Sequence, residues 1–268
     1  MPDIDVAGHR VSYQEAGTGP TVILAHCSLA YGGLWKGVMA ALADRWHCVA
    51  LDLPGHGQTD RGDEALSLQH QAVAYVEALT TAMGAPAHMV GLSLGGAVMG
   101  RVASRSPALT RSLTLIEPVY FHLIADQPAH MAANASAMGP VHQACNEGRY
   151  HDGARAFMDA WGQPGQFDRM PKPAQDSIAR SLGFLSADFD MVSEWPEGQI
   201  TREDITAIPA RTLLMQGERT PGSAKAILDA VEMLKPDAER FEVPGAGHLS
   251  PVDDPEAVAA RLRQFFVS

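Results

Sequence analysis

Residues 88–103 read HMVGLSLGGAVMGRVA, and this stretch decides the fold because three local patterns follow one another within it. The apolar run His88–Leu92 has the composition of a strand buried on both faces. The turn at residues 91–95 matches G-x-S-x-G, and residues 96–103 have helical spacing. So sharp a turn strains its serine and pushes the hydroxyl clear of the backbone. Ser93 is therefore a candidate nucleophile at the positive end of a helix, and a serine that caps a glycine-rich turn is the alternative interpretation.

The alternation of buried strand and helix continues on both sides of this stretch. An alternating pattern predicts a strand at residues 5–16, before a glycine-rich turn. Short apolar runs predict further strands at residues 21–26, 48–53, 112–117, 211–217 and 240–243. Helical spacing appears at residues 68–83, 224–234 and 255–266. Apolar strands that alternate with amphipathic helices predict an α/β fold with a mostly parallel sheet.

Residues 119–207 break this alternation, because they contain no convincing buried strand and their helical patterns are interrupted by prolines. A helical insertion after a strand end predicts a lid over a site at the carboxyl ends of the strands. The alternative is that the aromatic residues of the insertion form only its own core. We therefore expect a core unit at residues 1–118 and 208–268, with residues 119–207 as a separate helical unit.

Composition and charge exclude several classes of protein. The 268 residues are 46% hydrophobic and 19% charged, which excludes a disordered or collagen-like chain. Asp and Glu total 31 against 20 Lys and Arg, and this net charge of -11 argues against a nucleic-acid partner. We interpret the acidity as an aid to solubility.

Three cysteines, at positions 27, 48 and 145, are too few for a disulfide framework and fit a reducing compartment. The chain contains no stretch of about 18 uncharged apolar residues, so we expect no membrane span. The first ten residues carry acids and have no apolar segment typical of a signal peptide. We therefore expect a cytoplasmic protein that does not bind membranes.

Four motifs in this order resemble the α/β-hydrolase family across nearly the whole chain. They are the strand end Leu24-Ala25-His26-Cys27, the loop DLPGHGQTD at residues 52–60, the G-x-S-x-G turn, and Gly247-His248 followed by Asp254-Pro255-Glu256. The resemblance implies an eight-stranded, mostly parallel sheet flanked by helices. It also implies that residues 119–207 form a helical cap inserted after the sixth strand.

A serine needs a base to remove its proton, and imidazole does this near neutral pH. His248 follows the predicted strand 240–243 on a loop that contains Gly245 and Gly247, and these glycines allow the ring to reach the nucleophile. The family resemblance implies that His248 is the base. It also implies that His26 and His56 order loops.

The acid that orients the base is where the family pattern breaks. The resemblance places an Asp in a G-x-x-D turn after the seventh strand, but Thr220 stands there and cannot carry a charge. We favour Glu117, because it ends a predicted buried strand and some branches of the family place their acid after this strand. The alternatives are Glu218 as the acid, or a protein that has lost catalysis.

The resemblance also implies that the backbone N–H groups of Ser28 and Leu94 form an oxyanion hole, which stabilises the charge that develops on a carbonyl oxygen. Cys27 replaces the usual glycine beside it, and we interpret it as a buried, inert thiol rather than a second nucleophile. Candidate substrate contacts, for which core packing is the alternative, are Tyr31, Trp35, Tyr120 and Trp161.

The sequence therefore predicts a serine hydrolase that cleaves a carboxylic ester, thioester or lactone of a small to medium apolar molecule through an acyl-serine intermediate. No His and carboxylate cluster has metal-ligand spacing, so we expect neither metal nor cofactor. A carbon–carbon bond hydrolase of the same fold and a non-catalytic ligand-binding protein are the alternatives. The sequence leaves the substrate and the oligomeric state open.

Overall fold

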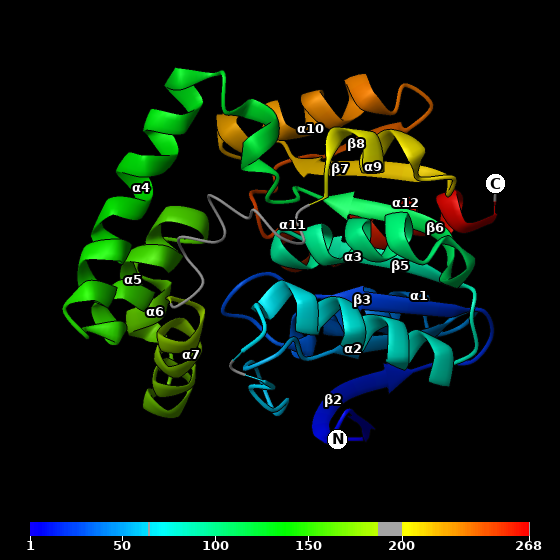
Figure 1. The fold of residues 1–268 in the computed structure, drawn as a ribbon, viewed down its shortest axis with the longest axis horizontal. Coiled ribbons are helices and arrows are strands. Elements are labelled where there is room, and N and C mark those ends of the chain that lie inside the picture. Colours follow the sequence, from blue (N-terminus) through cyan, green and yellow to red (C-terminus); the bar gives the residue numbers. More distant parts are fainter. Residues whose placement is uncertain (64, 187–199, 268) are drawn as a thin grey trace.

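A computed structural model describes residues 1–63, 65–186 and 200–267. The described residues form one eight-stranded sheet in the order β1-β2-β4-β3-β5-β6-β7-β8 (Figure 1). Its strands are β1 (Asp3–Val6), β2 (His9–Ala16), β3 (Thr21–Ala25), β4 (His47–Leu51), β5 (Ala87–Leu92), β6 (Thr110–Ile116), β7 (Thr212–Gly217) and β8 (Glu239–Val243). The pairs β1–β2 and β2–β4 are antiparallel and all the others are parallel. The predicted mostly parallel, eight-stranded sheet is confirmed.

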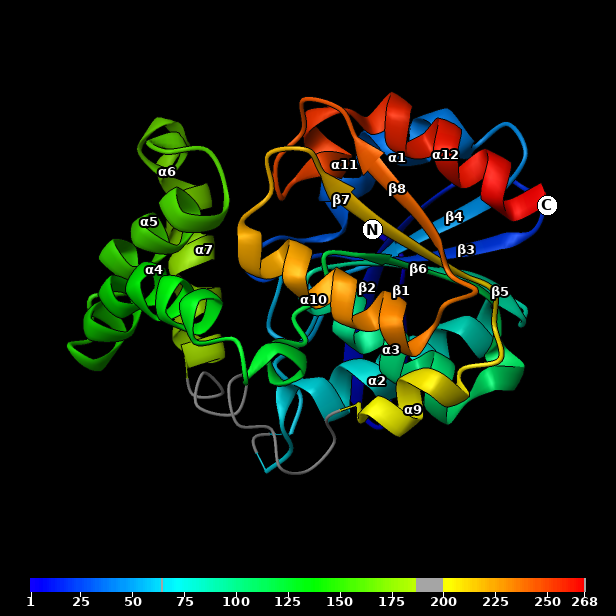
Figure 2. The ribbon, with the colours of Figure 1, turned by 90° about the horizontal axis from the view of Figure 1, so that it is seen from above.

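Helices cover both faces of this sheet (Figure 2). The α-helices are α1 (Lys36–Leu42), α2 (Leu68–Ala82), α3 (Leu94–Arg105), α4 (Pro128–Asn146), α5 (Tyr150–Trp161), α6 (Gln166–Arg169), α7 (Lys172–Leu185), α9 (Arg202–Ala207), α10 (Gly222–Leu234), α11 (Ser250–Asp253) and α12 (Pro255–Val267). Short 3-10 helices are η1 (Gly32–Trp35), η2 (Pro107–Leu109) and η3 (Phe121–Ile124). Within the described part of the chain, none of these helices combines the length and the apolar character that crossing a membrane requires.

The central strands are apolar on both faces because each face packs against helices. In β3, Val22 and Leu24 pack in the core beneath α1 and α12, whereas Ile23 and Ala25 pack in the core beneath α2 and α3. Successive side chains of a strand point to opposite faces, so a strand covered twice reads as a continuous apolar run. This explains why the sequence identified the central strands so readily.

The N-terminal residues differ from the prediction of one strand at residues 5–16. The chain forms a hairpin of β1 and β2, and its two-residue turn is Ala7-Gly8. Both turn residues have positive φ, 54° and 85°, as a primed two-residue turn requires. Such a turn matches the right-handed twist of the two strands. The sequence contains no sign of it, because the alternation of apolar and polar residues continues across the turn.

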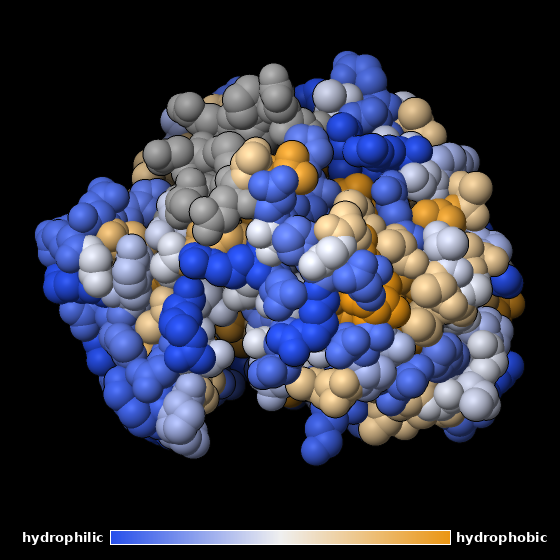
Figure 3. All heavy atoms as spheres, turned by 60° about the horizontal axis from the view of Figure 1, so that its bottom comes forward, coloured by the Kyte–Doolittle hydropathy of each residue, from blue (hydrophilic) through white to orange (hydrophobic). Residues whose placement is uncertain are grey.

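Helices α4 to α7, named here the helical segment, lie together at the end of the sheet toward which β6, β7 and β8 run (Figures 1 and 2). The surface of this segment seen in Figure 3 is mostly hydrophilic. Its partly buried apolar side chains, such as Met138 and Trp161, pack against the main core or line a cavity. The division into core and cap remains a prediction, and residues 187–199 of the predicted cap lie outside the described residues.

Candidate active site

Ser93 lies in the turn between β5 and α3, at the carboxyl end of a central strand. Its φ of 56° and ψ of -115° are strained for a residue with a side chain. Two glycines permit this turn. A Cβ on Gly91 would lie 2.2 Å from the carbonyl oxygen of Gly95, and a Cβ on Gly95 would lie 2.2 Å from that of Ala25. The Ser93 N–H donates to the carbonyl of Ile116 over 2.9 Å, which ties the turn to β6.

Glu117 follows β6, His248 follows β8, and the fold brings their side chains together from positions 131 residues apart. Nδ1 of His248 lies 2.6 Å from Oε2 of Glu117, and the two residues are only 7% and 1% exposed. An ionised carboxylate can only accept, so the proton of this hydrogen bond sits on Nδ1. In the neutral ring, Nε2 then carries the free lone pair that a general base needs.

The Glu117 carboxylate has two further donors, and both come from β7 and the turn after it. The N–H of Gly217 donates to Oε1 over 2.8 Å, and the hydroxyl of Thr220 donates to Oε2. The backbone of Glu117 has a positive φ of 46° and its N–H donates to Met215 in β7 over 3.2 Å. Thr220 thus stands where the resemblance implied an acid and instead holds the acid of the neighbouring strand.

Glu218, the alternative acid, has a different partner. Its Oε2 accepts from the N–H of Gly245 over 2.6 Å, and its side chain is exposed. This contact ties the turn after β7 to the loop that carries His248. The structure therefore brings Glu117, and not Glu218, against the imidazole.

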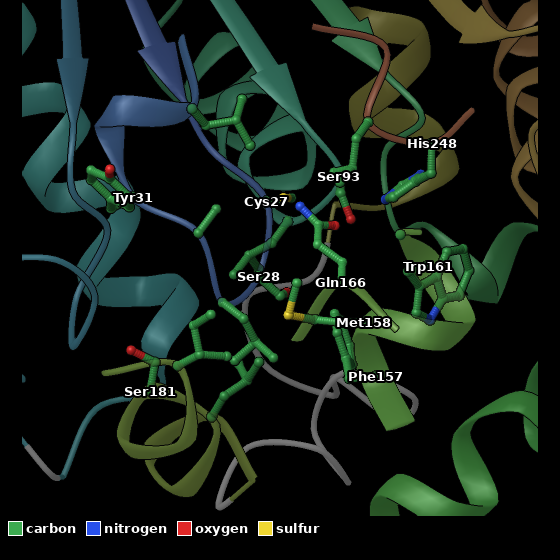
Figure 4. Close-up of a pocket in the computed structure, with 18 of the residues that line it drawn as sticks. Cys27, Ser28, Tyr31, Ser93, Phe157, Met158, Trp161, Gln166, Ser181 and His248 are labelled. Carbon is green, nitrogen blue, oxygen red and sulfur yellow. The ribbon is translucent and has the colours of Figure 1, made fainter. Parts of the chain in front are cut away.

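The hydroxyl of Ser93 and the ring of His248 point toward one another at the wall of a cavity (Figure 4). The Trp161 ring of the helical segment packs beside the imidazole, with 5.1 Å between the ring centroids and an angle of 56°. Ser93 itself is only 6% exposed. The ring of His248 thus faces Ser93 on one side and contacts the Glu117 carboxylate on the other, at the carboxyl edge of the sheet.

Ser28, in the loop after β3, and Leu94, the first residue of α3, line the same cavity, and each has a backbone N–H group. Within the described residues, neither N–H has a hydrogen-bond acceptor. Unpaired N–H groups at a helix start and in a neighbouring loop are the donors that an oxyanion requires.

Two buried histidines hold the loop that carries Ser28. Nε2 of His56 accepts from the N–H of Leu29 over 3.2 Å, and Nε2 of His26 accepts from the N–H of Leu53 over 2.9 Å. Their Nδ1 atoms lie 2.7 Å and 2.9 Å from backbone carbonyls. Burial lowers the pKa of His26 to about 4, and burial together with the neighbouring His26 lowers the pKa of His56 to about 3. Both rings are therefore neutral, and each uses one nitrogen as donor and the other as acceptor.

Cys27 lines the cavity but is only 7% exposed. Burial raises the pKa of its thiol to about 12, so the thiol stays protonated at neutral pH. Only the thiolate is a strong nucleophile. These properties are those of the inert thiol expected from the sequence.

The cavity has a volume of about 960 Å³ and lies between the helical segment and the carboxyl edge of the sheet. Of the candidate substrate contacts, Tyr31 and Trp161 line it. Trp35 is fully buried among the residues beneath α1, and Tyr120 is 2% exposed and donates to the Gly96 carbonyl over 3.3 Å. Neither of these two lines the cavity, so packing is their role.

Residues of the helical segment that the sequence did not single out complete the wall. Methionines and Phe157 supply apolar surface, while Asn134 and Gln166 supply carboxamides. The side-chain oxygens of Asn134 and Gln166 are buried and have no hydrogen-bond partner in the described residues. A lone Gln or Asn among helical patterns carries no signal by which a sequence alone would identify it. The described residues contain no cluster of His, Cys, Asp or Glu side chains arranged to hold a metal ion.

Known proteins resemble this chain at several levels. The model of a family described as "Alpha/beta hydrolase family" matches residues 22–261. Pimeloyl-[acyl-carrier protein] methyl ester esterase of Methylococcus capsulatus is 39% identical over 103 residues, which are 38% of this chain and 39% of that protein. This chain thus spans about two fifths of that relative's length. The 2-(acetamidomethylene)succinate hydrolase of Mesorhizobium japonicum is 24% identical over 98% of this chain and 93% of its own.

Solved structures show the same fold. The enol-lactonase of Burkholderia xenovorans LB400 superposes with a TM-score of 0.79 at 18% identity, over 100% of both chains. At this identity the likeness concerns the fold alone.

Proposed function

This chain belongs to the alpha/beta hydrolase family, and from that membership we propose that it is a serine hydrolase acting on a carboxylic ester, thioester or lactone. The substrate is a small to medium, largely apolar molecule. The observation that carries the proposal is the 2.6 Å contact between Nδ1 of His248 and Oε2 of Glu117, made beside Ser93 on its strained turn. A relative that hydrolyses a methyl ester supports the same reaction class.

In the proposed acylation, Oγ of Ser93 attacks the carbonyl carbon while Nε2 of His248 takes the hydroxyl proton. Glu117 keeps the other ring proton on Nδ1 and stabilises the imidazolium that forms, because its carboxylate is 2.6 Å away and buried. The proton on Nε2 then passes to the leaving alkoxide or thiolate, and the acyl group stays on Ser93.

The negative charge of the tetrahedral intermediate falls on the carbonyl oxygen. We assign the N–H groups of Ser28 and Leu94 to this oxygen, since neither has an acceptor among residues 1–63, 65–186 and 200–267. Each such donor is worth about 2.7–4 kcal/mol of transition-state stabilisation. His56 holds the loop that contains the first donor through its contact with Leu29.

Deacylation repeats the same steps with water. Nε2 of His248 removes a proton from water, the hydroxide attacks the acyl carbon, and the proton returns to Oγ of Ser93 as the acid leaves. The helical segment serves as a cap in this proposal, because its side chains close one side of the cavity and Trp161 packs on the histidine ring. Its apolar wall favours apolar acyl or leaving groups.

A carbon–carbon bond hydrolase would use the same three side chains, and a ligand-binding protein would keep the cavity without turnover. Thr220 stands where the family resemblance implies an Asp, but its hydroxyl contacts Glu117, and the Glu117 carboxylate contacts His248. The histidine therefore still has a carboxylate partner, which favours catalysis over binding alone. We also propose that the partner of this protein is a small-molecule substrate.

Labelling and turnover test the proposal together. We expect a fluorophosphonate probe to label Ser93, and a chromogenic short-chain ester to give a burst of product followed by steady turnover. Ser93→Ala should abolish both signals, while the variant keeps its melting temperature. An absence of labelling and turnover in the wild-type protein, together with stabilisation by bound esters, would instead identify a binding protein.

A further inference from the structure

The cavity beside Ser93 has neither a lysine nor an arginine among its lining residues. Its wall includes Met1, which carries an amino group, and the two histidines His142 and His248. The undescribed positions, 64, 187–199 and 268, contain no lysine or arginine either, so all 20 of these residues belong to the described part of the chain. The wall does contain a carboxylate, Asp52, whose oxygens accept from the N–H groups of Gly32 and Gln58 over 2.7 Å and 2.9 Å.

A negatively charged substrate group would therefore lose its hydration in this cavity without gaining a lysine or an arginine as an ionic partner. Burying an unpaired carboxylate is strongly unfavourable, and the nearby Asp52 adds repulsion. An uncharged group of the same shape suffers neither effect. The charge distribution of the wall thus discriminates by the charge of the substrate.

One polar group of the helical segment reaches toward the nucleophile. The carboxamide of Gln166, from α6, extends into the cavity toward Ser93 (Figure 4). A Cβ added at Gly162 would lie 3.7 Å both from Oε1 of Gln166 and from Cδ1 of Leu249, the residue after His248. Gln166 and Leu249 are therefore both neighbours of Gly162.

The oxygen of this carboxamide is buried and has no hydrogen-bond partner within the described residues. Buried polar atoms without partners are uncommon, because they have lost water and gained nothing in return. A carboxamide turned about its last bond offers either an acceptor or two donors at the same place. A bound hydroxyl or amide group near the scissile carbonyl would donate to this oxygen, and a bound keto group would accept from the NH₂ of the carboxamide in its turned orientation.

We propose that this site selects uncharged esters whose acyl chain carries a polar group near the scissile carbonyl, and that Gln166 is the specificity-determining residue that binds this group. This inference rests on the proposed serine hydrolase activity and names its substrate class. Carboxylate-bearing esters are excluded by the same wall.

Three hexyl esters of matched shape test the inference. They are the esters of 4-oxopentanoic acid and pentanoic acid and the half-ester of succinic acid, in which a carboxylate replaces the methyl ketone. Turnover is measured by pH-stat at pH 8, where histidines of ordinary pKa are neutral. We expect kcat/KM for the half-ester to be at least about 100-fold below that for the 4-oxopentanoate. We expect the 4-oxopentanoate to exceed the pentanoate by about tenfold.

Gln166→Leu should remove the tenfold preference for the keto ester over the pentanoate, so that the ratio of the two kcat/KM values falls to about one. The matched control is Gln163→Leu, the same change at an exposed residue three positions earlier that does not line the cavity. It should leave all three values unchanged. Gln166→Arg, which adds a positive charge at the site, should raise kcat/KM for the half-ester at least tenfold. Hydrolysis of the half-ester within fivefold of the keto ester by the wild type, or an unchanged keto preference in Gln166→Leu, would overturn the inference.

Binding to the Ser93→Ala variant separates this inference from the proposed function. Calorimetry should show that the keto ester binds this variant at least tenfold more tightly than the half-ester, whether or not the wild-type protein turns either over. Equal affinities would refute the charge selection even if hydrolysis is fast. Selective binding without turnover in the wild type would refute the proposed hydrolase and retain the selection.

Discussion

Replacing Glu117 by glutamine tests the proposed catalytic chain most directly, since it changes one atom and almost no volume. The wild-type carboxylate accepts from three donors, namely the N–H of Gly217, the hydroxyl of Thr220 and Nδ1 of His248. In the variant, the amide oxygen keeps the first contact at Oε1, so the amide NH₂ takes the place of Oε2. This group can only donate.

The consequence falls on the tautomer of His248. Facing an NH₂ group, Nδ1 has to accept, so the ring proton moves to Nε2 and the lone pair that would take the Ser93 proton is lost. The buried imidazolium also loses its counter-charge at 2.6 Å. By analogy with other catalytic triads we expect kcat to fall by about 10⁴, which corresponds to about 5.4 kcal/mol of barrier height.

The fold should tolerate this change. Glu117 is 1% exposed, and replacing a buried charge by a neutral group removes a desolvation cost, so we expect the melting temperature to stay or rise. Steady-state turnover of a chromogenic ester and thermal unfolding measure the two effects separately. The control is Glu218→Gln, which we expect to stay within about twofold because Glu218 contacts the N–H of Gly245 and not the imidazole. Turnover of Glu117→Gln within tenfold of the wild type would refute the reasoning, and a large loss in Glu218→Gln alone would reverse the assignment of the acid.

Three further predictions follow from the same contacts. Thr220→Val should lower kcat by about tenfold, because it removes one hydrogen bond to the Glu117 carboxylate. Thr220→Ser, which keeps a hydroxyl, should have a kcat close to that of the wild type. Equal activity of the two variants would show that the hydroxyl has no positioning role. Cys27→Ser should keep kcat within a few-fold, since burial raises the pKa of the thiol to about 12, and complete loss of turnover would make the thiol a catalytic group. The free energy of unfolding, measured by urea titration, should fall as the pH drops below about 6.5, because His26 and His56 have their pKa lowered to about 4 and about 3 and protonate first in the unfolded chain. At pH 5 the expected loss of unfolding free energy is about 2 kcal/mol for each histidine. His56→Asn should therefore reduce the slope of the unfolding free energy against pH. An unchanged slope in that variant would contradict the conclusion that the His56 ring is neutral in the fold.

The sequence by itself determined the central strands, several of the helices around them and the edge at which the site lies. The central strands were recognisable because helices on both faces make them continuously apolar. Ser93 was recognisable because its turn requires glycines where an added Cβ would lie 2.2 Å from a backbone oxygen. Since parallel strands end at one edge, the positions of Glu117 and His248 after their strands already predicted a common site. These features follow from local pattern and chain direction.

Only the tertiary structure decided which side chains meet there. Glu117 and Glu218 both follow strands that end at this edge, and it is the packing of β6 against β7 that turns the first toward His248 and leaves the second at the surface. The tertiary structure likewise decided the places of four other side chains. Thr220 contacts Glu117, Trp35 and Tyr120 are buried in the core, and Gln166 lines the cavity. Local sequence determines where a strand ends, whereas the direction of a side chain depends on contacts made by residues more than 100 positions away.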